Sequence, residues 1–189
     1  MAKEVRNMPR LQEVYVQTIR PQLMTSLNLE NVMEIPKISK IVLNIGSKDS
    51  INDSKALNTA VEGLAKISGQ KPVKTLARKS IAGFKLREGM AIGAMVTLRS
   101  KVMYEFLDRL ISTALPQIRD FQGVTRRLDG RGGYNIGIKD WMIFPEIDYG
   151  MFDRSYGLNI SIHTTAKNDE HGFALLKAFG MPFAKSDKQ

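Results

Sequence analysis

The sequence predicts an α+β fold, in which helices pack on one face of an antiparallel or mixed sheet and the other face stays open to solvent. Several short segments alternate between aliphatic and polar residues with the period of a strand. The segments between them carry one apolar stripe at helical spacing. The chain has 189 residues, of which 43% are hydrophobic, so we expect a packed core and a single domain over residues 1–189.

The first two predicted elements are a helix and a strand. Apolar residues at helical spacing predict an N-terminal helix over about residues 6–28, which Pro21 should kink or split. Residues 38–45 alternate like a half-buried strand, with Lys40 and Asn44 on the outer face. The residues expected on its inner face are Ile41, Leu43 and Ile45.

A second helix and a second strand flank a basic loop. The helix should begin at Asp53 or Ser54 as N-cap and end at Gly69. The loop covers residues 71–90, and a strand follows from Ala91 to Arg99. Alternation in this strand turns Gly93, Met95, Thr97 and Arg99 outward.

The second half of the chain contains two helices and two short strands. Ser100 should cap a helix that Pro116 ends. An Arg/Gly-rich loop region follows over about residues 119–143, and it contains the first of two strands predicted at residues 134–139 and 158–164. The last helix should run from about Asn168 to Phe179, with Gly180 at its stop.

Composition restricts the class of function. The formal net charge is +9 and the sequence pI is near 9.8, which favours a polyanionic partner over small metabolites. Absence of Cys excludes disulfides, thiolate catalysis and Cys-based metal sites. No apolar run suits a membrane span or a signal peptide, so we expect a cytosolic location and no membrane partner.

The basic loop is the strongest local signal. Between Lys71 and Arg87 there are six cations and no acidic residue, and glycine interrupts the run. Cations on a solvated helix usually alternate with Glu, whereas a loop held between structured segments is a common place for binding residues. This pattern indicates a phosphate-binding loop.

The predicted outer face of the sheet carries hydrogen-bond donors and cations. Its members are Lys40, Asn44, Thr97, Arg99, Asn135, Lys139, Asn159, Ser161 and His163. Such a face is also what any half-solvated sheet presents, but together with the acid-free loop it favours RNA in an RRM-like layered architecture. The face carries no Phe or Tyr for stacking single-stranded bases, so structured RNA fits better.

No enzyme motif is found. His163 and His171 lack a Cys or carboxylate arrangement for metal binding or catalysis. The acidic group of Glu146, Asp148 and Asp153 has no spacing typical of a metal loop. Residues 130–133 match GxxG, but they precede a strand instead of joining two helices. We therefore expect no metal, cofactor or small-molecule substrate.

Several blocks of sequence resemble a known family. They are IPKISKIVLNIG (35–46), LAKISGQKPVKTLARKSIAGFKLREG (64–89), LPQIRDFQGV (115–124), FPEIDY (144–149), TTAKNDEHG (164–172) and LLKAFGMPF (175–183). In order and spacing, they are similar to the bacterial form of the fifth protein of the large ribosomal subunit. The resemblance implies a structural role in the cytoplasmic ribosome. It implies binding to 5S rRNA and its attachment in the central protuberance.

The resemblance also implies particular partners and residues. Asn44, Gln70 and Thr97 match 5S rRNA-binding positions, and we add Lys40 and Arg99 from the outer face. The alternative for Gln70 is a hydrogen bond that stops the helix. The implied P-site tRNA contact is the loop with Arg78, Lys79, Ser80, Phe84, Lys85 and Arg87. The implied intersubunit contact with small-subunit head protein thirteen comprises Arg126, Arg127, Arg131 and Trp141.

Further implied partners are 23S rRNA and the other 5S rRNA-binding large-subunit proteins, eighteen and twenty-five. Two departures from the family pattern stand out: Ser47-Lys48 after the NIG block, and Trp141 before FPEI.

Two other classes of function remain as alternatives. One is a stand-alone RNA chaperone or regulator using the same face. The other is an RNA-modifying or RNA-cleaving enzyme, which would need a titratable pair that Glu88 alone does not supply.

Overall fold

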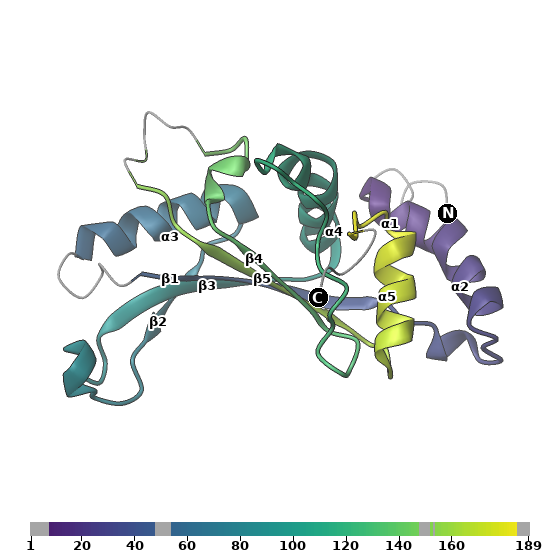
Figure 1. Cartoon of the computed structure of the whole chain (residues 1–189), viewed down its shortest axis with the longest axis horizontal. Coiled ribbons are helices and arrows are strands. Elements are labelled where there is room, and N and C mark those ends of the chain that lie inside the picture. Colours follow the sequence, from purple (N-terminus) through teal and green to yellow (C-terminus); the bar gives the residue numbers. More distant parts are fainter. Residues whose placement is uncertain (1–7, 48–53, 148–151, 153, 185–189) are drawn as a thin grey trace. The chain divides into compact units, whose positions relative to one another are not determined.

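The computed structural model describes residues 8–47, 54–147, 152 and 154–184, except the side chain of residue 54. Figure 1 shows the elements along the chain. The helices are α1 (Arg10–Val14), α2 (Arg20–Ser26), α3 (Ser54–Ser68), α4 (Ser100–Arg109) and α5 (Asp169–Ala178). The strands are β1 (Ile38–Gly46), β2 (Val73–Leu76), β3 (Ala91–Leu98), β4 (Tyr134–Ile138) and β5 (Leu158–Thr164).

Shorter helical turns connect these elements. Two are π-helical, η2 (Tyr15–Ile19) and η6 (Leu110–Ala114). The 3-10 turns are η3 (Val32–Glu34), η5 (Ala82–Phe84), η7 (Leu115–Gln117) and η8 (Trp141–Ile143). Because α1, η2 and α2 follow one another directly, they form one helical run of three segments.

The strands form one five-stranded antiparallel sheet in the order β2-β3-β1-β5-β4. The predicted α+β class is therefore confirmed. The predicted alternation also holds, because Ile41, Leu43 and Ile45 are fully buried whereas Lys40 and Asn44 are half-buried. On the later strands Asn135, Asn159 and His163 are exposed and Ser161 is half-buried, as expected for an open face, and Lys139, one residue after β4, is exposed too.

Strand β2 lies inside the segment that the sequence predicts as a loop. It pairs antiparallel with β3, with Val73 opposite Met95, Lys74 opposite Ala94 and Thr75 opposite Gly93. None of its four residues is fully buried, so its own side chains show no strand periodicity. The pairing with β3 makes this segment a strand, and such a nonlocal cause is not visible in the local pattern.

The chain forms two compact units, which are described separately. Unit 1 comprises residues 1–41, 99–136 and 161–189, and unit 2 comprises residues 42–98 and 137–160. Strands β1, β4 and β5 contribute residues to both units. The expectation of one domain stays a prediction.

The N-terminal helix illustrates how proline shapes unit 1. Pro21 lacks a backbone N–H and lies in the first turn of α2, directly after the π-helical turn of η2. The chain stays helical through Pro21 and changes from π-helical to α-helical turns just before it, so the predicted kink or split at Pro21 stays a prediction. The predicted start near residue 6 lies outside the described residues.

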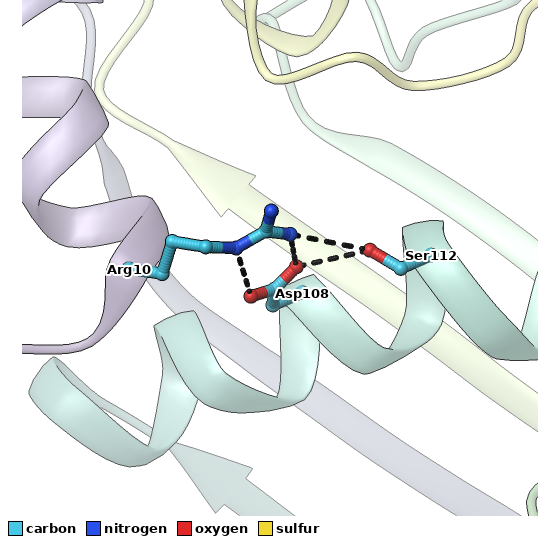
Figure 2. A network of polar contacts seen from close by, with 3 residues as sticks. All are labelled: Arg10, Asp108 and Ser112. Atoms are coloured by element: carbon cyan, nitrogen blue, oxygen red, sulfur yellow. Dashed lines mark hydrogen bonds and ion pairs between the residues drawn. The ribbon is translucent and has the colours of Figure 1, made fainter.

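An ion pair joins α1 to α4 within unit 1. Figure 2 shows the Arg10 guanidinium facing the Asp108 carboxylate, with the Ser112 hydroxyl beside both. The Arg10 Nε donates to Asp108 Oδ2 at 3.0 Å, and a second guanidinium nitrogen donates to Oδ1. The Ser112 hydroxyl also donates to Oδ1 at 3.0 Å. The hydrogen bond from Arg10 lowers the pKa of Asp108 below its ordinary value.

The helix boundaries agree with the stop signals in the sequence and differ at one cap. Gly69 and Gly180 adopt positive φ angles of 67° and 84° just after α3 and α5, as C′ glycines do. The helical run that begins with α4 continues through η6 and η7 to Gln117, one residue beyond Pro116. Its N-cap is Arg99 instead of Ser100, and Ser100 itself has a φ of 51°. The alternative N-cap Asp53 lies outside the described residues.

Trp141 is the largest buried side chain of unit 2. Its exposed fraction is 0%, and its ring meets Phe152 and Tyr156 edge-on at centroid distances of 5.3 and 5.0 Å. A Cβ built on Gly63 of α3 would lie 2.2 Å from the indole Cη2 atom. Only glycine at position 63 therefore leaves room for this indole.

We expect Gly63→Ala to lower the free energy of unfolding by about 1–3 kcal/mol, because overpacking outweighs the gain of about 1 kcal/mol in helix propensity. Urea denaturation measures this. The losses of Gly63→Ala and Trp141→Leu should be less than additive in the double variant, because the smaller side chain removes the clash. A Gly63→Ala variant as stable as the wild type would contradict this packing.

Tyr104 gives unit 1 a sensitivity to alkali. Its ring lies 6.2 Å from Phe179, and burial raises the pKa of Tyr104 from 10.0 to about 12. The unfolded chain then releases this proton first, so stability is complete below pH 10 and falls as pH rises toward 12. Thermal melts should show a smaller alkaline loss in Tyr104→Phe than in the wild type. Equal losses in both proteins would contradict the raised pKa.

Candidate nucleic-acid interface

The open sheet face of unit 2 brings Asn44 and Thr97 together. The Ser47 N–H donates to the Ile92 carbonyl at 3.1 Å, which sets the register between β1 and β3. Continued along the strands, this register places Asn44 opposite Met95, and Thr97 in the next pair on the same face. Asn44 and Thr97 are both half-buried. An amide and a hydroxyl are thus diagonal neighbours on a solvated surface.

Lys40 and Arg99 belong to unit 1. Lys40 lies on β1 and is half-buried, and Arg99 follows the end of β3 as the N-cap of α4 and is exposed. The five predicted 5S rRNA-binding residues are therefore divided between the units. Asn44, Gln70 and Thr97 lie in unit 2.

Gln70 follows the end of α3. The side chain that forms hydrogen bonds at this helix end is Ser68, not Gln70. The buried Ser68 hydroxyl lies 2.7 Å from the Leu64 carbonyl and accepts from the Gln70 backbone N–H at 3.2 Å. Among the described residues the Gln70 side chain makes no hydrogen bond, and it is exposed. The side chain of Gln70 thus does not stop the helix, and it faces solvent.

The segment from Ala77 to Met90, here called the arm, is a preformed hairpin extension of β2 and β3. Its base is closed by Ala77, whose N–H donates to Met90 O at 2.8 Å and whose carbonyl accepts from Gly89 at 3.0 Å. Nearer the tip, Ile81 and Leu86 exchange two backbone hydrogen bonds of 3.0 and 3.1 Å. The Ser80 hydroxyl accepts from the Glu88 N–H at 3.0 Å. The arm therefore has a defined backbone.

All six residues predicted for the tRNA-binding loop lie on the arm and are exposed; they are Arg78, Lys79, Ser80, Phe84, Lys85 and Arg87. The turn η5 presents Phe84 with an exposed fraction of 67%. Lys85 closes that turn with a left-handed φ of 54°. Lys74 differs from these cations, because its Nζ donates to Asn58 Oδ1 of α3 at 2.8 Å. The arm thus presents four cations and one aromatic ring.

The glycine-rich turn of unit 1 is occupied by the chain's own carboxylates. Asp169 accepts from the N–H groups of Gly130 and Gly132 at 3.1 and 2.9 Å. Asp129 accepts from Arg131 and Gly133, both at 2.8 Å, and these bonds lower the pKa of Asp129. The amides that a GxxG clamp would offer to phosphate are therefore already bonded.

The predicted intersubunit residues have different environments. Arg127 and Arg131 are exposed. The Arg126 Nε donates to the Ala184 carbonyl at 2.9 Å and its guanidinium lies 5.9 Å from the Phe173 ring centre, so this cation helps to fasten the C-terminal segment. The intersubunit role that the resemblance implies for Trp141 does not fit this structure, because its side chain is fully buried in the core. The apolar residues and the proline near Trp141 in the sequence favour this core position.

No metal-binding cluster is found within the described residues. No group of three or more His, Asp or Glu side chains there has metal-binding geometry. Asp148 and Asp153 of the predicted acidic group lie outside the described residues. In the described part, no helix is both long and apolar enough to cross a bilayer.

The fold and this surface define a class of protein. It is a basic, open-faced α+β protein whose surface suits a polyanion, with a preformed cationic arm. Family models agree with this class. Residues 31–87 match ribosomal protein L5, and residues 91–183 match the model for the C-terminus of the same ribosomal family.

Curated relatives support the same family over most of the chain. A protein named large ribosomal subunit protein uL5 from Syntrophotalea carbinolica is 58% identical over 177 residues, covering 93% of this chain and 96% of the relative. Proteins of the same name from Geotalea uraniireducens and Herpetosiphon aurantiacus are 56% and 55% identical, covering 93% of this chain and 99% of each relative. The chain belongs to the ribosomal protein L5 family.

This membership confirms several expectations from the sequence. The chain is a ribosomal, RNA-binding protein with a structural instead of an enzymatic role. Its expected location in the cytoplasmic ribosome is confirmed as well. The RNA-modifying enzyme alternative is thereby excluded.

Proposed function

We propose that this structural constituent of the large ribosomal subunit binds 5S rRNA with the open sheet face and contacts P-site tRNA with the arm. The observation that carries the proposal is the joint presence, in unit 2, of the Asn44–Thr97 pair and an arm with four exposed cations. Polar groups on a rigid sheet suit the 2′-hydroxyls and base edges of structured RNA. Exposed cations on a hairpin suit a phosphate backbone.

Binding to 5S rRNA helps to attach it in the central protuberance, next to 23S rRNA and the large-subunit proteins eighteen and twenty-five. Cations neutralise phosphates and release counterions, while side-chain donors set the register of the RNA on the sheet. With about five phosphate contacts, log affinity should fall with log salt at a slope of roughly −4 to −5.

The intersubunit contact with small-subunit head protein thirteen rests on fewer residues than the sequence implied. Arg127 and Arg131 remain in this proposal, because both are exposed. Arg126 and Trp141 are left out, since they act within the chain itself.

A stand-alone regulator of messenger or structured RNA is the second candidate. The same basic surface would serve it, so the two candidates differ in location. A structural protein should co-sediment with large subunits through high salt in a sucrose gradient, together with 5S rRNA. A regulator should dissociate from the subunits.

We expect Asn44→Ala with Thr97→Ala to weaken binding of purified 5S rRNA by roughly tenfold to a hundredfold, since each lost hydrogen bond is worth about 1 kcal/mol. Filter binding measures the affinity. The matched control is Thr18→Ala with Gln22→Ala on the exposed side of the N-terminal helix, which removes similar groups elsewhere. Unchanged affinity in the Asn44 and Thr97 variant would sink the assignment of the open face.

We expect Lys79→Gln with Lys85→Asn to leave 5S rRNA binding intact and to speed tRNA release from the ribosomal P site by roughly threefold to tenfold. Asn is chosen at position 85 because it tolerates the left-handed backbone there. Lys101→Gln with Lys177→Gln, two exposed cations on α4 and α5, is the control of equal charge. Equal release rates in both variants would contradict a tRNA contact by the arm.

A further inference from the structure

Three apolar side chains of unit 2 are exposed at the base of the arm. Val73 and Leu76 of β2 have exposed fractions of 66% and 58%, and Met95 of β3 has 37%. We call these three residues the apolar stripe. Leaving large apolar groups in water has a cost, so a cluster of them on a binding face is informative.

Strand pairing puts Val73 and Met95 on the open face. They are direct partners in the β2–β3 register, and directly opposite residues share a face. Ala94 and Val96 on either side of Met95 are buried, so Met95 points away from the helices. The neighbouring pair of Lys74 and Ala94 faces the other way, where Lys74 reaches α3.

A β-bulge follows at the end of the pairing. The register shifts between Thr75 and Leu76, where β3 contains one extra residue and Leu76 pairs with Ala91. Leu76 is 58% exposed at this point. A second large aliphatic side chain of β2 is thus in solvent next to the arm.

The stripe adjoins the polar pair of the candidate interface. Met95 is the partner of Val73 on one side and, in the register set by Ser47 and Ile92, of Asn44 on the other. One row of side chains across three strands therefore consists of the Asn44 amide, the Met95 thioether and the Val73 isopropyl group. A hydrogen-bonding group and an apolar surface lie side by side.

We propose that the apolar stripe packs against the ribose and base edges of a minor groove in structured RNA, an inference that rests on the proposed binding of 5S rRNA. A minor groove of RNA presents 2′-hydroxyls beside sugar C–H groups, which matches polar groups next to apolar ones. The sequence from Lys71 to Arg87 is free of acidic residues, so the surroundings favour a polyanion.

The size of the stripe also favours RNA over a protein partner. Specific protein interfaces use roughly 20–30 residues on each side, whereas the stripe has three. On RNA, a few apolar contacts suffice because phosphate contacts supply much of the affinity. The stripe therefore contributes a part of the affinity that does not depend on salt.

Salt titration of 5S rRNA binding separates this contribution from phosphate contacts. In the full-length variant Val73→Thr with Met95→Gln, shape and β-propensity are nearly kept and no charge changes. We expect its affinity to fall by roughly fivefold to twentyfold at every salt concentration. The slope of log affinity against log salt should stay at the wild-type value, whereas Lys40→Gln with Arg99→Gln should make it shallower by about 2.

The matched control is Val32→Thr with Met33→Gln, the same exchanges at residues of η3 that are 45% and 86% exposed. It should bind like the wild type. Leu76→Thr is a second variant of the stripe, and thermal melts report whether each variant folds.

Wild-type affinity in folded stripe variants, combined with weakened binding by Asn44→Ala, overturns the inference and leaves the proposed function standing. A wild-type protein that binds 5S rRNA no better than an unrelated structured RNA overturns the proposed function, and the inference with it. Normal 5S rRNA binding, together with loss of a neighbouring protein from subunits that carry the stripe variant, assigns the stripe to a protein partner instead.

Discussion

The backbone pairing of β2 with β3 determines what the candidate interface presents. Strand β2 buries little of its own surface, so backbone hydrogen bonds to β3 and the contact from Lys74 to Asn58 fix its position. That register decides which side chains of β2 face the helices and which face solvent. It also fixes where the arm leaves the sheet, since Ala77 closes the hairpin directly after β2. The open face and the arm are consequences of one pairing.

Charged groups have different surroundings at the glycine-rich turn and on the arm. In unit 1, Asp129 and Asp169 bind the amides of the glycine-rich turn, and Arg126 holds the C-terminal segment. The polar groups there are used to stabilise the chain. In unit 2, the cations of the arm are exposed and the amides of the hairpin bond within the hairpin. Charge that is not needed for folding remains available for a polyanion.

Much of the fold follows from periodicity in the sequence, because burial acts on the residues that carry the pattern. Ile41, Leu43 and Ile45 alternate and are buried, and Gly69 and Gly180 end their helices as expected. Strand β2 and the packing around Trp141 cannot be predicted from periodicity. Strand β2 depends on its pairing with β3, and the packing of Trp141 depends on Gly63 of α3. Nonlocal contacts of this kind leave no local period. Alternation put Asn44 and Thr97 on the outer face of the sheet, where both are half-buried, whereas the intersubunit role that the resemblance implied for Trp141 does not fit its buried side chain.

Lys85 at the tip of the arm has a consequence for the thermodynamics of association. A left-handed backbone at a lysine costs about 1 kcal/mol of free energy relative to glycine. Lys85 adopts this conformation, and the position therefore carries an ammonium group that glycine would lack. The two hydrogen-bonded pairs at Ala77 and Ile81 hold this conformation in the unbound protein. A ligand therefore meets a backbone that already has its conformation, so complex formation loses conformational entropy mainly in the side chains of the arm.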